Sequence, residues 1–422
     1  MMATAVVVLA GTIAIGVRGI ENIKAYNQAV EAAVRRDWAT AYDHLVTAAQ
    51  LAPGMPFYHR QLGVVAGYLA EEESVYRREA ITQYQSALTG LDQLAVDHAN
   101  LACLLGQAGQ PAEAVRELRL ALELEPGNPR YHLNLGQALE QTGDYPAAWS
   151  QYADVLAAWP DEVQSSFWSQ SQLRREALSE IVTAAAGRLV KTGPAGAPQL
   201  IQLYLYAGNI ELARQTYDQL LAQGPVDPLA RHLAKGRILQ AQNRLAEAQA
   251  EVEAALAVEP AGSEVYMMLS EIALAQHRLE AAEESAEAAL FLAENPDTLY
   301  QAAQTAAAAG HQARAIDLYE AAFNALTADD DPNLARYATE VARRRPLPLN
   351  YLPCLSRIYP TPRLVALTLA EGRLLEQQGD FQAAAQVYER LLVYEPDAAA
   401  VSARFEELCR ARPAVCDFRA NR

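Results

Sequence analysis

The sequence is poor in cysteine and has no excess of glycine or proline in its 422 residues. Its 22 glycines and 21 prolines exclude a collagen-like or low-complexity chain. Its four cysteines are too few for a disulfide scaffold, and no two of them have the spacing of zinc ligands. Because 51% of the residues are hydrophobic and only 20% are charged, the chain can bury a large core and wholesale disorder is excluded.

Basic residues are also scarce relative to acidic ones. The chain has 34 lysines and arginines against 51 acidic residues, for a net charge of −17. Such a surface repels the phosphate backbone, which argues against a role in binding DNA or RNA. A basic or neutral protein segment is the better expected partner.

The first 17 residues, MMATAVVVLAGTIAIGV, carry no charged side chain, and Arg18 ends the run. As a helix this run spans roughly 26 Å, slightly less than the ~30 Å core of a bilayer. It has no basic residue before it, which argues against a cleavable signal peptide. Residues 1–18 are therefore predicted to be a membrane anchor; the alternative is a buried N-terminal capping helix. Its apolar side chains include Val6, Val7, Val8, Leu9, Ile13, Ile15 and Val17.

The charges after this run predict which side of the membrane the rest of the chain occupies. Arg18 and Lys24 follow the apolar run, and only the terminal amine precedes it. Because positive charges favour the inner side, we expect a single anchor in a bacterial cell membrane with the C-terminal part in the cytoplasm. An extracytoplasmic location or a soluble cytoplasmic protein are the alternatives.

Internal repetition dominates the rest of the chain. Residues 100–126 and 134–160 match each other at a shift of 34 residues. The aligned pairs are Ala102 and Gly136, Leu105 and Leu139, Gly109 and Gly143, Ala114 and Ala148, Leu118 and Tyr152, and Pro126 and Pro160. Several independent positions agree, so the repeat is specific.

One alanine of this pattern recurs along the whole chain, and we call its copies the anchor alanines. Four residues after each, a mostly large apolar side chain follows. Two of the spacings are close to twice 34, which predicts a degenerate unit around Ala177 and another around residues 334–358. The anchor alanines are Ala41, Ala80, Ala114, Ala148, Ala213, Ala248, Ala282, Ala315 and Ala384.

This period and this order of residues resemble the tetratricopeptide repeat. The resemblance implies an all-α superhelical solenoid of antiparallel helix pairs, in which small residues mark close helix crossings and neighbouring units must stack to bury their apolar faces. An insertion at residues 70–76 should lengthen the first helix of its pair or the turn after it. The expected segments are an anchor at 1–18, repeat units at 19–160, a degenerate helical pair at 161–193, repeat units at 194–328, a degenerate unit with a proline-rich loop at 329–362, a last unit at 363–410 and a tail at 411–422.

More narrowly, the chain resembles the C-terminal repeat region of bacterial O-antigen ligase and polymerase-type membrane proteins. The likeness lies in an apolar helix leading into YNQAVEAAVRRDWATAYDHLVTAAQLAP at residues 26–53, and in YHRQLG at 58–63, NLACLLGQAGQPAEAV at 100–115, YHLNLGQALEQTGDYPAAWSQYADVL at 131–156 and SSFW at 165–168. The polytopic domain that would carry transferase chemistry is absent from this sequence. The resemblance therefore implies either a free-standing relative or the regulatory repeat region of a longer protein, in which Met1 is not the native start.

No catalytic, cofactor or metal site is expected. The sequence has no glycine-rich phosphate loop, no nucleophile elbow and no pair of histidines at the spacing of metal ligands. Cys409 and Cys416 are predicted to be reduced unless the C-terminus faces an oxidising compartment, and Cys103 and Cys354 to be packing residues. The aromatic residues around Phe167 are expected to repack a distorted repeat, the alternative being a recognition patch. The histidines are His44, His59, His98, His132, His232, His277 and His311.

Binding is the expected activity, because the first helices of such a solenoid line a concave groove that holds an extended peptide or a partner helix. Amide side chains at one register of these helices would hydrogen-bond the ligand backbone, or would instead cap and cross-link neighbouring helices. The predicted groove residues are Asn27, Gln61, Asn100 and Asn134. Positions of the lysine-rich clamp of chaperone-binding relatives carry Tyr26, Arg60, Ala99 and Leu133, which argues against chaperone tails as ligands.

The sequence therefore predicts a non-catalytic scaffold or adaptor in a bacterial membrane-associated assembly. The alternatives are a regulatory domain of a membrane glycosyltransferase and a soluble adaptor. The identity of the partner and the oligomeric state are not encoded in any motif of the sequence.

Overall fold

A computed structural model describes residues 21–33, 37–89, 94–222, 224, 226–327, 352, 354–355, 361–394 and 398–416. Within these residues all regular structure is helical, as the sequence predicts. The chain divides into two compact units, each described by itself. Unit 1 comprises residues 1–151 and 328–357, and unit 2 comprises residues 152–327 and 358–422.

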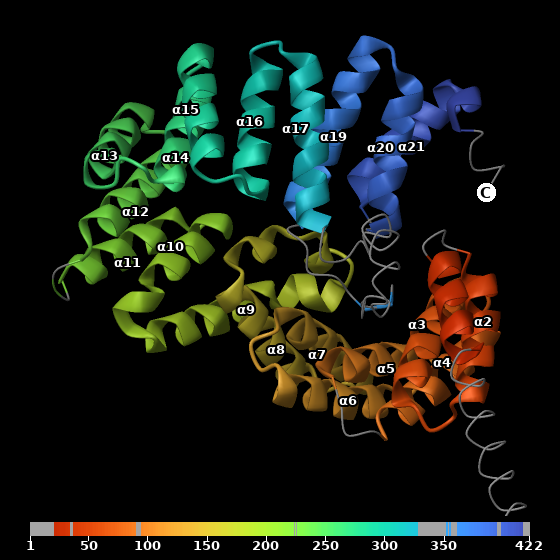
Figure 1. The fold of residues 1–422 in the computed structure, drawn as a ribbon. Helices are drawn as coiled ribbons and strands as arrows, with labels where there is room; N and C mark the ends of the chain where they lie inside the picture. Colours follow the sequence, from red (N-terminus) through yellow and green to blue (C-terminus); the bar gives the residue numbers. More distant parts are fainter. Residues whose placement is uncertain are drawn as a thin grey trace, which may run out of the picture. The chain divides into compact units, whose positions relative to one another are not determined.

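Unit 1 consists of helix pairs that follow one another along the chain (Figure 1). Residues 21–33 are helical and precede the first labelled helix. The helices that follow are α2 (Trp38–Leu51), α3 (Pro56–Glu72), α4 (Val75–Ala87), α5 (Ala95–Gln107), α6 (Pro111–Leu124), α7 (Pro129–Thr142) and α8 (Tyr145–Ala158). The boundary with unit 2 falls within α8.

Unit 2 continues with a less regular stretch and then with further pairs. Its first elements are the 3₁₀ helices η1 (Pro160–Gln164) and η2 (Ser166–Trp168), the helix α9 (Gln172–Lys191), and the 3₁₀ helix η3 (Gly193–Gly196). The later helices are α10 (Ala197–Tyr206), α11 (Ile210–Ala222), α12 (Pro228–Ala241), α13 (Leu245–Val258), α14 (Ser263–Ala275), α15 (Leu279–Leu292), α16 (Pro296–Ala308), α17 (Gln312–Thr327), α19 (Thr361–Gln378), α20 (Phe381–Tyr394) and α21 (Ala399–Ala411).

The anchor alanines lie in the core of the fold. All nine lie on second helices of pairs and are at most 1% exposed. The residues four positions later are buried as well, and four of these are the fully or almost fully buried tyrosines Tyr84, Tyr152, Tyr319 and Tyr388. The sequence interpretation of small residues at helix crossings beside large apolar ones is thus confirmed.

The turn between the two helices of a pair also repeats. In seven of these turns one residue has a positive φ between 58° and 85°, and these residues fall at spacings close to 34 or its double. In each, the next backbone N–H donates to the carbonyl five residues earlier, as from Asp144 to Leu139 at 3.0 Å, which closes the helix end. Five of these residues are glycine, and the other two are Asn243 and His277. These seven turn residues are Gly109, Gly143, Gly208, Asn243, His277, Gly310 and Gly379.

The irregular segments have local causes. The helix α3 has 17 residues where α5 has 13, so the insertion at residues 70–76 lengthens the first helix of its pair. In the segment 161–193, where the sequence predicts a helical pair, the structure has two short 3₁₀ helices and one α-helix of 20 residues. Pro160, which lies shortly after the end of α8, begins the first of these 3₁₀ helices.

Two predicted segments lie largely outside the described residues. The predicted membrane anchor at residues 1–18 is one, and most of the predicted loop at 329–362 is the other. Among the helices that are described, none is both long and apolar enough to cross a membrane.

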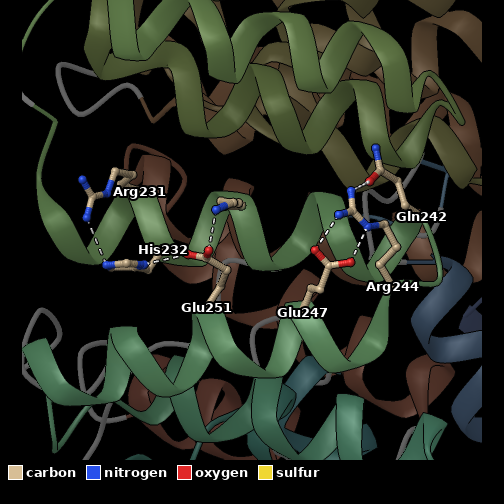
Figure 2. Close-up of polar contacts among 7 residues, drawn as sticks. Arg231, His232, Gln242, Arg244, Glu247 and Glu251 are labelled. Atoms are coloured by element: carbon tan, nitrogen blue, oxygen red, sulfur yellow. Dashed lines mark hydrogen bonds and ion pairs between the residues drawn. The ribbon is translucent and has the colours of Figure 1, made fainter.

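Polar side chains join the two helices of a pair, and Figure 2 shows the example of α12 and α13. His232 Nδ1 and Lys235 Nζ on α12 lie 2.8 Å and 2.5 Å from the carboxylate of Glu251 on α13. At the start of α13, Arg244 Nε donates to Glu247 Oε1 at 2.8 Å. The pKa of Glu251 is lowered overall. Burial by itself would raise this pKa, but the hydrogen bonds from Lys235 and His232 together have the larger effect.

A second carboxylate of unit 2 is more deeply buried. Glu371 in α19 is 2% exposed, and Arg390 Nη2 of α20 donates to its Oε2 at 2.7 Å. Burial raises the pKa of Glu371 to about 7; Arg390 opposes this shift, and the charge of Glu320 adds to it. The folded state therefore favours the neutral acid.

Replacing Gly372 by alanine should destabilise the protein. A β-carbon at Gly372 would overlap the ring of Tyr388, and overpacking of this kind costs about 1–3 kcal/mol. Gly187→Ala in α9 is the matched control, because a β-carbon there meets nothing within 4 Å and alanine favours a helix by up to about 1 kcal/mol. Thermal unfolding followed by circular dichroism should show a lower midpoint for the first variant only. Equal midpoints for the two variants would contradict the packing at Gly372.

Glu371→Gln should change how stability depends on pH. As the pH rises from 4.5 to 7, the unfolded chain ionises Glu371 and the folded chain does not, so the wild type loses stability. The variant lacks this loss. Its free energy of unfolding should therefore rise, relative to that of the wild type, by up to about 3 kcal/mol by pH 7. Glu251→Gln should behave oppositely, matching the wild type in acid and falling below it above pH 4.5, because the pKa of Glu251 is lowered. Urea denaturation at a series of pH values tests both; parallel curves for Glu371→Gln and the wild type would refute the first.

Candidate functional site

One of the predicted groove amides, Asn100, binds main chain from a distant part of the sequence. It lies in α5, is 1% exposed, and its Oδ1 accepts a hydrogen bond from the backbone N–H of Leu352 at 2.9 Å. Its Nδ2 donates to the hydroxyl of Tyr84 at 3.0 Å. Burial raises the pKa of Tyr84 well above its usual value, and the charge of Asp97 adds to this, so the hydroxyl stays protonated.

The residues around this hydrogen bond are buried too, and we call Leu352, Cys354 and Leu355 the groove segment. Leu352 and Leu355 are at most 1% exposed. The Leu352 side chain occupies space that only a glycine of α3 leaves open: a β-carbon on Gly67 would lie 2.5 Å from Leu352 Cδ2. A disulfide joins Cys354 to Cys103 of α5, with the two Cα atoms 5.8 Å apart.

A cavity of about 150 Å³ adjoins the groove segment, and we call it the unit 1 groove. The groove is lined by the first helices α5 and α7, by α6 and by Cys354. Its lining combines small apolar residues with amide side chains. The lining residues are Ala102, Cys103, Gly106, Gln107, Ala114, Leu118, Asn134, Gln137, Ala138, Gln141 and Cys354.

The structure brings two of the four predicted amides to this site and places the others apart from it. Asn134 lines the unit 1 groove, and its Nδ2 donates to the carbonyl of Arg130 in its own helix at 2.8 Å. Gln61 in α3 is fully buried, and its amide has no hydrogen-bond partner within the described part of the chain. Asn27 is half-buried on the helical residues 21–33.

A buried ion pair links the first helices α3 and α5. Arg60 Nε donates to Asp97 Oδ2 at 2.6 Å, and the two residues are 6% and 1% exposed. Arg60 occupies a position where chaperone-binding relatives carry a basic clamp residue. Here its charge is already paired with an acid of the neighbouring first helix, so its contribution is to hold α3 and α5 together.

The histidines link helices in the same way within several units. His98 Nδ1 donates to Glu117 Oε2 at 2.7 Å, and His132 Nδ1 lies 2.8 Å from Gln151 Oε1. His59 and Gln83 make the same contact at 2.6 Å between α3 and α4. In each case the partner lies on the second helix of the same pair. Among the described residues there is no group of three or more metal-binding side chains.

The aromatic residues beside the irregular stretch are mostly structural. Phe167 and Trp168 are buried and pack edge-on against Tyr152 at centroid distances of 5.2 and 5.7 Å. Trp168 Nε1 donates to the carbonyl of Glu162 at 2.6 Å, and the guanidinium of Arg174 covers the Phe167 ring at 3.9 Å. These contacts agree with repacking of a distorted repeat.

The cysteines differ from the sequence prediction. Cys103 and Cys354, predicted as packing residues, form a disulfide, and so do Cys409 and Cys416, predicted as thiols. All four cysteines of the sequence are thereby paired. Sequence reasoning missed the first disulfide because its cysteines are 251 residues apart and no repeat period relates them.

Comparisons with known proteins agree with the helical repeats. Residues 100–163, 233–298 and 369–404 match the family model of the tetratricopeptide repeat. No curated protein sequence matches the chain.

Several solved structures are similar to the chain. A tetratricopeptide repeat protein from Parabacteroides merdae is 16% identical, with 68% of this chain and 98% of that chain covered and a TM-score of 0.30. YrrB, described as a TPR protein with an unusual peptide-binding site, is 20% identical, with 50% and 90% covered and a TM-score of 0.30. The Cut9–Hcn1 hetero-tetramer of the APC/C is 11% identical, with 92% and 90% covered and a TM-score of 0.40. The matched segments are thus similar to the tetratricopeptide repeat, and the described residues of the chain form an all-α helical-repeat fold.

Proposed function

We propose that the protein is a non-catalytic scaffold that binds an extended segment of a partner protein in the unit 1 groove. The hydrogen bond from the Leu352 backbone to Asn100 carries this proposal, because it is a main-chain contact to an amide on a first helix. Repeated amide side chains on such helices can bind any extended backbone, whatever its sequence.

The composition of the groove supports an extended ligand over a helical one. Gln107 and Gln141 of its lining are exposed, and Gln137 is half-buried. The amide of Gln107 also contacts Arg77 and Glu71. Amide groups donate and accept hydrogen bonds, so they suit a backbone whose N–H and C=O groups are free. A helix satisfies these groups internally and would leave the amides without a main-chain partner.

We further propose that the scaffold works at a bacterial membrane. Support comes from the uncharged run at residues 1–17, which includes Val6 to Leu9 and lies shortly before the first repeat in the sequence. The pairing of all four cysteines favours the extracytoplasmic alternative over the cytoplasmic side predicted from Arg18 and Lys24, because disulfides persist in oxidising compartments.

Purification of the native protein in mild detergent distinguishes this proposal from its alternatives. Mass spectrometry of the purified material gives the chain mass and the co-purifying proteins. A membrane-bound 45.9 kDa chain with envelope proteins at stoichiometric levels is the expected result. A much longer native chain would instead identify the repeat region of an O-antigen ligase-like enzyme. A soluble chain without partners would refute the membrane scaffold.

Gln141→Trp should then weaken capture of the co-purified partner. The indole would fill much of the unit 1 groove from an exposed position, so the fold should be retained while the partner loses its site. We expect a loss of about tenfold or more in affinity, which corresponds to about 1.4 kcal/mol.

The matched control is Gln85→Trp, which places the same side chain at an exposed position of α4 in the same unit. It should leave partner capture unchanged. Capture is measured per folded molecule, with folding checked by circular dichroism. If both variants bind like the wild type, the partner does not use the unit 1 groove.

A further inference from the structure

The groove segment is held in unit 1 by three contacts of different chemistry. Asn100 binds the backbone N–H of Leu352, the Leu352 side chain packs over Gly67, and Cys354 is bonded to Cys103. The contacts involve two first helices, α3 and α5, which belong to successive repeat units. A segment far along the chain therefore lies across consecutive first helices in unit 1.

Two of these contacts are of the kind that a separate peptide would make. A main-chain hydrogen bond to an amide gives affinity without regard to sequence, and a buried leucine over a glycine gives selectivity for one side chain. Leu355 is buried as well, three residues after Leu352. The groove segment thus presents a backbone contact and two leucines in the manner of a bound ligand.

Space for a longer occupant continues beyond the segment. Cys354 forms part of the wall of the unit 1 groove, which extends along α5 to Asn134 and Gln141 of α7. On the α3 side, Gln61 occupies the register that aligns with Asn100, and its buried amide has no partner in the described residues.

We propose that the groove segment is an internal ligand, locked by the Cys103–Cys354 disulfide, that keeps an external peptide out of unit 1. The inference rests on the proposed function of the groove and adds a mechanism that controls access of the ligand to it. The external ligand is an extended peptide with two leucines three residues apart. Reduction of the disulfide allows this peptide to replace the groove segment.

The unlocking reaction is thiol–disulfide exchange with a dithiol donor. One donor thiolate attacks a sulfur of the disulfide, the bond between Cys103 and Cys354 breaks, and a mixed disulfide forms. The second donor thiol then releases the remaining cysteine. Two electrons and two protons pass to Cys103 and Cys354, which become thiols, and the donor becomes a disulfide. Both cysteines are partly exposed and border the groove, so a donor has access to them.

The disulfide is needed for complete exclusion, because without it an external peptide could still displace a fraction of the internal ligand. A tethered segment has an effective concentration on the order of millimolar, against which a weak external peptide competes poorly. The disulfide makes the exclusion complete. After its reduction, the external peptide has only to compete with the tethered groove segment.

The first test is the disulfide itself. Native protein isolated with its thiols alkylated is digested without reductant and examined by mass spectrometry. In the fraction without a bound partner we expect a cross-linked fragment pair that contains Cys103 and Cys354, whereas the partner-bound fraction should give both residues as alkylated thiols. Recovery of both residues as alkylated thiols from the partner-free fraction would overturn the lock.

The second test measures binding of a probe peptide to the full chain. The probe is a fluorescent peptide with the sequence of residues 348–357, PLNYLPCLSR, carrying Cys354→Ser, and binding is read by fluorescence anisotropy. Oxidised wild type should not bind it. The double variant Leu352→Asp/Cys354→Ser, whose internal ligand is weakened and unlocked, should bind at least about tenfold more tightly, and reduced wild type should lie between the two.

Controls separate the lock from other effects. The same probe with Leu352→Asp should not bind any of the proteins. The variant Cys409→Ser/Cys416→Ser should keep the full response to dithiothreitol, because its disulfide lies in unit 2. Circular dichroism of the double variant and of the reduced wild type shows whether unit 1 remains folded in each.

The outcomes distinguish this inference from the proposed function. If folded double variant and reduced wild type bind the probe no better than oxidised wild type, the internal ligand is refuted. If the native partner is nevertheless lost on Gln141→Trp, the groove still binds a partner and the groove segment is a structural part of unit 1. If neither probe nor partner depends on the groove, both proposals fail.

Discussion

Close packing between helices at the anchor alanines is the constraint on which the rest of the structure depends. Each repeat brings its second helix close to its neighbours at a residue without bulk, and a large side chain four positions later fills the space beside the crossing. No pair can bury its apolar face by itself, so each must stack on another. The polar links follow from this geometry. The histidine–glutamate pairs and Arg60–Asp97 join helices that the crossings have already brought together.

The sequence predicts this part of the structure well because the same physical requirement recurs every 34 residues. An alanine at one position is weak evidence for a crossing, but nine at a common spacing are strong evidence. The turn residue shows why the repeat period predicts the left-handed conformation better than the residue type does. Asn243 and His277 adopt the left-handed conformation at positions where other units have glycine, and only the register reveals this.

The candidate site is less predictable from the sequence, because its contacts do not recur with the repeat period. Gln61, Asn100 and Asn134 occupy one register, yet each has a different environment: within the described residues, Asn100 accepts a hydrogen bond from the groove segment, Asn134 bonds within its own helix, and the amide of Gln61 has no hydrogen-bond partner. The groove segment lies in a stretch where the repeat pattern fails, and its contacts join residues that are about 250 positions apart. No local period encodes such a contact. It depends on the path of the chain after folding, where Gly67 leaves the space that the Leu352 side chain occupies.

The Cys103–Cys354 disulfide also has a mechanical consequence. It closes a covalent ring that contains the residues between positions 103 and 354, which is most of the repeats. A tensile force applied between the two ends of the chain passes through the disulfide and does not load the backbone inside the ring. The helices α6 to α17 are therefore shielded from extension, and the load falls on the N-terminal helices and on α19 to α21. A chain held at one end and pulled at the other would extend on either side of the ring and keep its central repeats folded.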